Sequence, residues 1–316
     1  MLRVVSFVLL GLLALLGFIV LVLPWLLPRP GLDGQIPEQP FADSQFEIID
    51  GTRLHFRARL AEPADRPLVV LLHGFGGSTF SWNATLDALE QAGYPVIAVD
   101  LPPFGYSERR GTGLAWAALV SGLVEQVAPG TERVWVGHSM GASVAATLAA
   151  NQPDSSSHLV IVAGTPEPRD RSGRLSPGLI GAVPALGRWV EVIAAHRLID
   201  EDNIRNMLAS AFGRAPTDDE FRGYFHPLSI PGTYPALLRR FGTEAELSST
   251  GWQMVPTTLI WGSEDRWVPL EVGERLQAAY PELPLRLIDQ TGHNPMETEP
   301  ERFQAILLEL LNPDPG

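Results

Sequence analysis

The fold is decided by residues 133–151, which read RVWVGHSMGASVAATLAAN. The apolar residues at its start predict a short buried strand, and the small residues that follow Ser139 predict a closely packed helix. Between the two, residues 137–141 (GHSMG) match the pattern G-x-S-x-G. The glycines of this pattern allow a sharp turn that lifts the serine hydroxyl off a sheet and directs the next backbone N–H, that of Met140, at a substrate oxygen. The stretch therefore predicts a nucleophilic serine between a strand and a helix.

The chain on either side alternates between strand and helix patterns. Short apolar runs rich in β-branched residues are typical of strands buried on both faces, and an Asp-Gly pair predicts a hairpin near the start of the body. Strands are predicted at 45–49, 52–60, 68–72, 94–99, 134–136, 159–162, 257–261 and 285–288. Helices are predicted at 82–92, 114–127, 139–151, 270–279 and 301–311. This order predicts an α/β fold with a mostly parallel sheet covered on both faces.

Residues 165–251 interrupt the alternation. They show no clear strand pattern, and helices are predicted at 187–198 and 203–212. A connection of this length with helices of its own is typical of a cap rather than a loop. The predicted organisation is an anchor (1–30), a linker (31–44), a first core segment (45–164), a helical cap (165–251) and a second core segment (252–316).

Composition excludes several classes of chemistry. The 316 residues carry a net charge of −13, which argues against nucleic acid as a partner because phosphate binding needs a basic face. All 23 basic residues are Arg, so Schiff-base chemistry, a phosphate-loop lysine and a Ser-Lys dyad are excluded. The chain has no Cys, which excludes thiol nucleophiles, disulfides and thiolate metal sites. No metal or cofactor is expected, and the sequence does not set an oligomeric state.

Residues 4–27 carry no charge and are almost entirely apolar. Their length predicts an uncleaved transmembrane helix, with a cleaved signal peptide as the alternative. A short basic N-terminus favours a cytoplasmic N-terminus, which would place the catalytic body in the periplasm or outside the cell.

Three further segments at strand ends bear chemically relevant residues. Residues 73–78 (HGFGGS) form a Gly-rich loop, in which the backbone N–H of Phe75 is a candidate oxyanion donor and His73 a structural anchor. Residues 262–269 (GSEDRWVP) supply carboxylates, and residues 289–293 (DQTGH) supply a histidine. A nucleophilic serine needs a base, and the base needs an orienting carboxylate, here in the order Ser…Asp…His.

With these segments in place, the chain resembles the α/β-hydrolase superfamily from about residue 45 to 311. The resemblance is carried by HGFGGSTFSW (73–82), DLPPFGYSE (100–108), GHSMGA (137–142), GSEDRWVP (262–269) and GHNPMETEPE (292–301). It implies an eight-stranded sheet, and a small-molecule or lipid ester as substrate.

The resemblance also implies the roles of the site residues. Ser139 would be the nucleophile, His293 the base and Asp265 the acid, and the backbone N–H groups of Phe75 and Met140 would form the oxyanion hole. For the acid, the outside alternatives are Glu264, Glu167 and Asp170.

The residues leave the reaction partly open. Relatives that attack carbon with a carboxylate, the haloalkane dehalogenases and epoxide hydrolases, have Asp where this chain has Ser139. The preferred hypothesis is a membrane-anchored serine hydrolase that cleaves carboxylic esters through an acyl-enzyme. A C–C bond hydrolase and a cofactor-free haloperoxidase or perhydrolase would use the same triad. A non-catalytic, membrane-tethered binding protein is the alternative from another class.

Overall fold

The computed structural model describes residues 2–29, 34–60, 66–109, 116–167, 183–197, 199–240 and 250–312. These residues form one eight-stranded sheet in the order β1-β2-β4-β3-β5-β6-β7-β8. The strands are β1 (Ser44–Ile49), β2 (Thr52–Arg59), β3 (Leu68–Leu72), β4 (Val96–Val99), β5 (Arg133–His138), β6 (Ser156–Val162), β7 (Thr257–Gly262) and β8 (Leu285–Ile288). The β1–β2 and β2–β4 pairs are antiparallel and the others are parallel. The predicted α/β fold and its eight-stranded, mostly parallel sheet are confirmed.

Helices cover both faces of this sheet, and the alternation of side chains along each strand explains why. In β3, Leu68, Val70 and Leu72 pack into the cluster that includes residues of α4 (Trp116–Val127), α5 (Met140–Asn151) and α11 (Leu270–Ala279). Val69 and Leu71 pack on the opposite side, with residues of α3 (Asn83–Gln91) and α13 (Pro300–Leu311). A strand that is apolar at every position must therefore be buried on both faces, as its sequence predicts.

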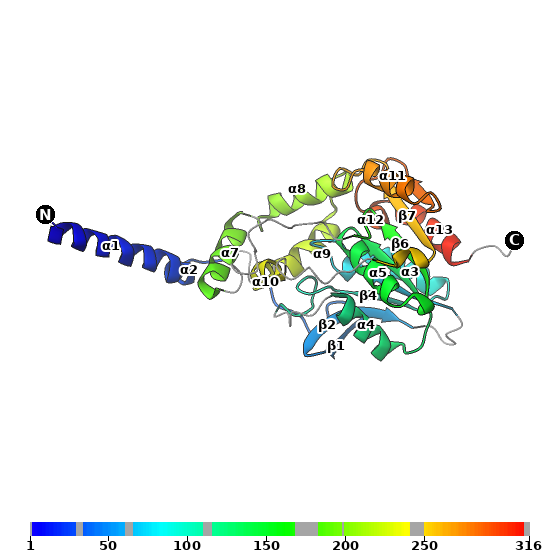
Figure 1. Cartoon of the computed structure of the whole chain (residues 1–316), viewed down its shortest axis with the longest axis horizontal. Coiled ribbons are helices and arrows are strands. Elements are labelled where there is room, and N and C mark those ends of the chain that lie inside the picture. The colour runs from blue at the N-terminus through cyan, green and yellow to red at the C-terminus, as the bar shows by residue number, and fades with distance from the viewer. Residues whose placement is uncertain are drawn as a thin grey trace.

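Further helices come between β6 and β7 in the sequence. They lie at the end of the sheet where the parallel strands finish (Figure 1). They are α7 (Pro184–Arg197), α8 (Glu201–Phe212), α9 (Asp218–Leu228) and α10 (Thr233–Arg240). The first two overlap the predicted helices, whereas α9 and α10 were not predicted. Pro227 lies inside α9, and a proline within a segment argues against a helix when only the sequence is considered. A reciprocal capping box between Thr217 and Glu220 begins α9, and this pattern is legible in the sequence.

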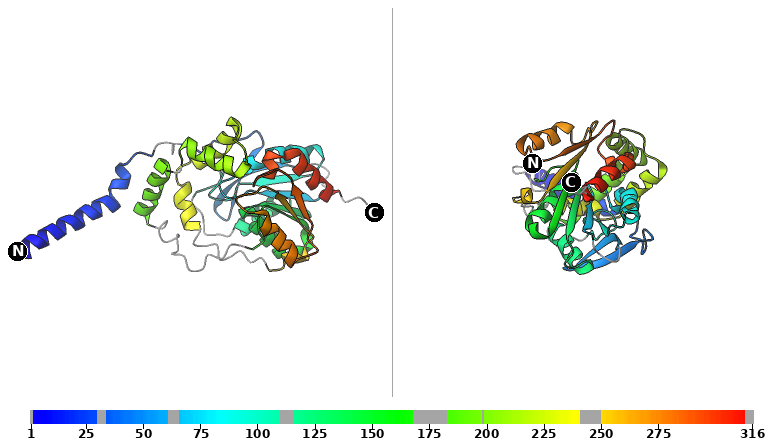
Figure 2. Two further views of the ribbon diagram at one scale, coloured as in Figure 1. Left: turned by 90° about the horizontal axis from the view of Figure 1, so that it is seen from above. Right: turned by 90° about the vertical axis from the view of Figure 1, so that its right-hand side faces the viewer.

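The remaining helical segments that the structure describes range from 3 to 20 residues. They are α1 (Leu2–Leu21), α2 (Leu23–Leu26), η1 (Thr79–Trp82), η2 (Pro153–Ser155), η4 (Trp252–Met254) and α12 (Pro295–Thr298). In two perpendicular views the N-terminal arm, residues 2–29 with α1 and α2, extends away from the sheet on the side of α7, and the C-terminus lies at the opposite end (Figures 1 and 2).

Over the residues that the structure describes, no helix combines the length and the apolar character needed to cross a membrane. A spanning helix must match the thickness of the bilayer's hydrocarbon core with continuous apolar surface. This finding contradicts the transmembrane helix predicted within residues 1–30. The localisation derived from it, a single-pass protein with a cytoplasmic N-terminus and a periplasmic or extracellular catalytic domain, is wrong on the same ground, and both are withdrawn.

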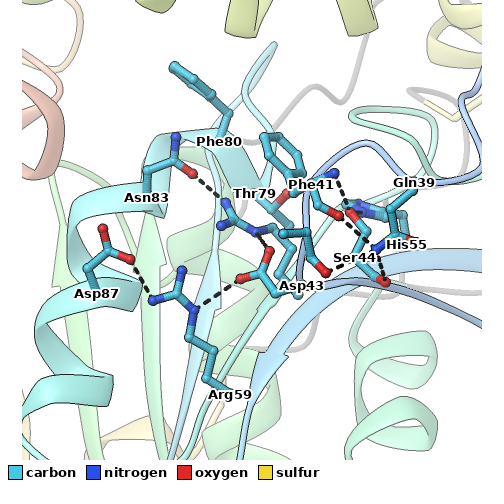
Figure 3. Close-up of polar contacts among 12 residues, drawn as sticks. Gln39, Phe41, Asp43, Ser44, His55, Arg59, Thr79, Phe80, Asn83 and Asp87 are labelled. Carbon is cyan, nitrogen blue, oxygen red and sulfur yellow. Dashed lines mark hydrogen bonds and ion pairs between the residues drawn. The ribbon is translucent and has the colours of Figure 1, made fainter.

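A polar network ties the β1–β2 hairpin to α3 (Figure 3). Asp43 accepts hydrogen bonds from Arg57 Nε at 2.6 Å and from Arg59 Nε at 3.0 Å. Arg59 also donates to Asp87 of α3 at 2.5 Å. Burial acts to raise the pKa of Asp43, but the two guanidinium groups outweigh it and lower the pKa. The hairpin is therefore fixed to α3 by charged groups, in addition to its strand pairing with β4.

Candidate active site

Ser139 lies at the turn between β5 and α5. Its φ of 51° and ψ of −114° are costly for a residue with a side chain, and such a conformation persists only where the surroundings hold it. The Ser139 backbone N–H donates to the carbonyl of Val162 at 2.8 Å. A Cβ atom at Gly137 would lie 2.3 Å from the carbonyl oxygen of Gly141, so the approach of β5 to α5 requires glycine. The turn therefore has the sharpness that the G-x-S-x-G pattern predicts.

Asp265 and His293 form a buried pair behind this serine. His293 Nδ1 lies 2.8 Å from Asp265 Oδ2. The other carboxylate oxygen, Oδ1, accepts the backbone N–H groups of Trp267 at 2.8 Å and Val268 at 2.9 Å. The two side chains are almost inaccessible, because Asp265 is 6% and His293 3% exposed. This arrangement can hold one imidazole tautomer, with Nδ1 protonated and Nε2 left to act as a base.

The alternative acids lie elsewhere. Glu264 and Glu167 are exposed, whereas the carboxylate that contacts His293 belongs to Asp265. Asp170 lies outside the described residues.

Two aromatic side chains contact the His293 ring. Trp267 stacks on it with ring centroids 5.6 Å apart and an interplanar angle of 23°. The His138 ring centroid lies 4.7 Å from that of His293, and His138 Nε2 donates to the His293 carbonyl at 2.9 Å. Burial, followed by the neighbouring His293, holds the pKa of His138 well below its usual value. His138 is therefore neutral at physiological pH, and it supports the base without adding a competing charge.

A small cavity of ≈ 40 Å³ brings these groups together. Ser139 and His293 both line it, along with Gly74 and Phe75 of the Gly-rich loop. Within the described residues, no hydrogen bond joins Ser139 Oγ to His293 Nε2. Catalytic hydrogen bonds are often long in unliganded enzymes and shorten when substrate binds.

The Gly-rich loop lies directly against the serine. A Cβ at Gly74 would lie 2.7 Å from His138 Nδ1 and 3.0 Å from Ser139 Cβ, so glycine is required for this contact. His73 holds the loop from behind: its Nδ1 lies 2.7 Å from the Gly74 carbonyl oxygen, and its Nε2 accepts the Leu101 N–H at 2.9 Å. Met140 begins the 12-residue helix α5, so its backbone N–H belongs to a helix N-terminus, which favours negative charge. This geometry is compatible with an oxyanion hole between the loop and α5.

Several residues of the site were not identified from the sequence. Ser81, Tyr224 and Asn294 also line the cavity, and Tyr224 donates to Glu297 Oε1 at 2.5 Å. Tyr224 lies on α9, and no local pattern shows that this helix reaches the cavity. Trp267 follows Asp265 by two residues, so its proximity to the site could have been expected.

The chain matches the model of the alpha/beta hydrolase family over residues 69–306. Since the match covers most of the chain and follows the observed fold, the protein belongs to this family of hydrolases.

The chain is similar in sequence to individual hydrolases and in fold to solved structures. The chain is 31% identical over 273 residues to the uncharacterized hydrolase YugF of Bacillus subtilis (strain 168), covering 83% of this chain and 96% of the relative. It is 26% identical over 259 residues to a 2-hydroxy-6-oxononadienedioate/2-hydroxy-6-oxononatrienedioate hydrolase of Pseudomonas sp, a match that covers 77% of this chain and 87% of that relative. Among solved structures, the epoxide hydrolase CorEH without ligand superposes with a TM-score of 0.67 at 21% identity, covering 85% of this chain and 98% of that one. At this identity the superposition shows the shared fold alone.

Proposed function

We propose that this hydrolase cleaves carboxylic esters through an acyl-enzyme on Ser139. The observation that carries the proposal is the buried His293–Asp265 pair at 2.8 Å, whose histidine lines one cavity with a serine held at a strained turn. Nucleophile, base and orienting carboxylate are the three groups that acyl transfer to serine needs.

The proposed reaction has two halves. His293 Nε2 takes the Ser139 proton as Oγ attacks the ester carbonyl, and the N–H groups of Phe75 and Met140 stabilise the oxyanion. His293 then gives the proton to the departing alcohol, which leaves an acyl group on Ser139. In the second half, His293 deprotonates a water molecule that attacks the acyl carbon, the acid is released, and the proton returns to Ser139. Asp265 keeps its hydrogen bond to His293 Nδ1 throughout and stabilises the imidazolium.

Reaction with a fluorophosphonate probe tests the proposal, because the probe bonds only to an activated serine. We expect one label per chain, located by peptide mass spectrometry on Ser139, and hydrolysis of phenyl esters with short acyl groups. Absence of both labelling and hydrolysis in folded protein would favour the non-catalytic binding protein. The cavity is far smaller than a pocket for a drug-sized ligand, so short acyl groups are the first substrates to test.

A second candidate is the hydrolysis of a C–C bond, which the similarity to the Pseudomonas hydrolase supports. Loss of the dienoate absorbance of a 2-hydroxy-6-oxo-dienoic acid would reveal it. The ratio of kcat/KM values for this compound and for a phenyl ester decides between the two reactions.

A further inference from the structure

The cavity beside Ser139 has two chemically different walls. The apolar wall consists of Met207, Leu208, Ala211 and Trp267. The polar wall consists of Ser81, Tyr224 and Asn294. None of the three polar side chains takes part in the acyl transfer proposed above, so their presence in the cavity calls for another role.

The polar wall is a connected chain of hydrogen bonds that ends on a carboxyl group. Tyr224 Oη lies 2.9 Å from Ser81 Oγ and donates to Glu297 Oε1 at 2.5 Å. Asn294 Nδ2 donates to the same carboxylate oxygen at 2.7 Å and to Tyr224 Oη at 3.1 Å. The chain thus connects η1, α9 and α12, three segments far apart in the sequence.

The protonation state of Glu297 decides which group donates and which accepts in each of these hydrogen bonds. An ionised Glu297 can only accept hydrogen bonds. The Tyr224 hydroxyl therefore donates its one hydrogen bond to Glu297, and Ser81 in turn donates to Tyr224. A neutral Glu297 can donate to Tyr224, which then donates to Ser81, and the Ser81 proton is free to point into the cavity. Burial raises the pKa of Glu297 to about 7, although its hydrogen bonds to Tyr224, Asn294 and Ser81 act to lower it. Both directions are therefore populated near neutral pH.

Several charged groups on the helices around Glu297 are paired with one another. Glu220, on α9, acts to raise the pKa of Glu297, but it is bonded to Arg214 at 2.6 Å. Of the helices packed against α12, α3 carries Asp87 and Glu90, which pair with Arg59. The helix α13 follows directly, where Arg302 lies 3.9 Å from Glu299.

We propose that Ser81 selects substrates whose acyl group carries a second carbonyl oxygen, and that Glu297, acting through Tyr224, positions the Ser81 proton toward that oxygen. The inference rests on the proposed ester hydrolysis at Ser139 and adds a substrate class to it. Ser81 follows the Gly-rich loop closely, since its Oγ would lie 3.2 Å from a Cβ at Gly77. It is therefore placed beside the loop that would hold the reacting carbonyl, within reach of an acyl substituent. Glu297 and Tyr224 are positioning residues, because they act through Ser81.

The test compares phenyl pentanoate with its 3-oxo and 4-oxo analogues by phenol release, in the full chain, from pH 6 to pH 8.5. For the wild type we expect the ratio of kcat/KM values, oxo ester to plain ester, to fall by about 10-fold as pH rises, the size of one hydrogen bond. In Glu297→Gln the titrating carboxyl group is absent, so the ratio should lose its pH dependence. In Ser81→Ala the ratio at pH 6 should fall by about 10-fold and lose its pH dependence.

Tyr224→Phe removes the hydroxyl that connects the Glu297 carboxyl group to Ser81, so the kcat/KM ratio should again lose its pH dependence. This variant tests the inference if Ser81→Ala does not fold. Matched controls are Ser157→Ala, where Oγ bonds to the Arg133 carbonyl, and Tyr280→Phe, where the hydroxyl of the half-buried Tyr280 lies 3.3 Å from Gln253 Nε2. Both should keep the wild-type pH profile of the ratio. A wild-type profile in Glu297→Gln, or an unchanged ratio in folded Ser81→Ala or Tyr224→Phe, would overturn the inference. If wild-type protein hydrolyses neither ester and takes no fluorophosphonate label, the proposed function itself has failed.

Discussion

Ser139 carries the proposed chemistry, and its replacement is the most direct test at the scale of single residues. Ser139→Ala removes the oxygen that would bond to the acyl carbon while leaving the backbone turn and its hydrogen bond to Val162 available. We expect kcat for phenyl esters to fall by a factor on the order of 10^4–10^6, as for serine hydrolases that lose a triad member. Circular dichroism and thermal unfolding should match the wild type. Substantial ester hydrolysis by this variant would contradict the mechanism.

Asp265 orients the proposed base, and its amide variant separates orientation from shape. Asp265→Asn can still pair with His293 Nδ1, but an amide N–H there favours the tautomer whose Nε2 is protonated and cannot act as a base. Steady-state kinetics should show a loss of kcat on the order of 10^4. Glu264→Gln is the control, because Glu264 precedes Asp265 in the same loop but is exposed. A crippled Glu264→Gln beside a nearly normal Asp265→Asn would mean that the acid is misassigned.

Glu297 should leave a signature in stability as well as in specificity. Its pKa is raised from 4.5 to about 7 in the folded chain, so between these values the folded state binds more protons than the unfolded state. Stability from this group is therefore full below about pH 4.5 and declines as pH rises to 7. Glu297→Gln lacks this decline, so its free energy of unfolding relative to wild type should increase by up to about 3 kcal/mol from pH 5 to pH 8. Urea unfolding at the two pH values measures it, and a constant difference would contradict the raised pKa.

At the scale of elements, the contact between β5 and α5 sets the geometry of the serine turn. Gly137→Ala would place a Cβ 2.3 Å from the Gly141 carbonyl oxygen, which the backbone cannot accommodate without moving the turn. We expect the free energy of unfolding to fall by more than about 3 kcal/mol. Gly17→Ala is the matched control, because its Cβ would meet nothing within 4 Å. Chemical denaturation of both variants makes the comparison, and equal stability for the two would show that the close approach is not required.

The sheet and the proposed triad were predictable because their signals are local. Each buried strand is a short apolar run, and Ser139 and Asp265 each follow such a run within a few residues, whereas His293 follows the edge strand β8. The polar wall was not predictable, since Tyr224 meets Glu297 across 73 positions of sequence and lies on a helix with proline inside it. Local patterns identify residues that follow the carboxyl ends of the strands. Side chains from a helix packed over those strand ends are revealed only by tertiary contacts.

At the scale of the whole molecule, the N-terminal arm is attached to α7 rather than to the sheet. Arg29 pairs with Glu191 at 2.5 Å, and Glu191 also accepts the N–H of Gly232 at 2.7 Å. Arg188 donates to the Leu27 carbonyl at 3.1 Å. The structure thus shows contacts from the N-terminal residues to α7, so these residues belong mechanically to the helical region between β6 and β7.

These contacts predict which part of the molecule depends on the arm. A truncated chain that begins at Gln35 loses Arg29 and leaves Glu191 without that partner, while every strand remains. We expect fluorophosphonate labelling of Ser139 and hydrolysis of short-chain phenyl esters to persist. Hydrogen exchange in α7 should accelerate by about 10-fold or more, because local opening of a helix follows the loss of its contacts. Exchange in β5 should stay at the wild-type rate. Arg29→Ala in the full chain should reproduce part of the effect in α7, since it removes the ion pair and keeps the arm. Unchanged exchange in α7 after truncation would show that the arm does not stabilise this helix, and lost labelling would show that the site depends on it.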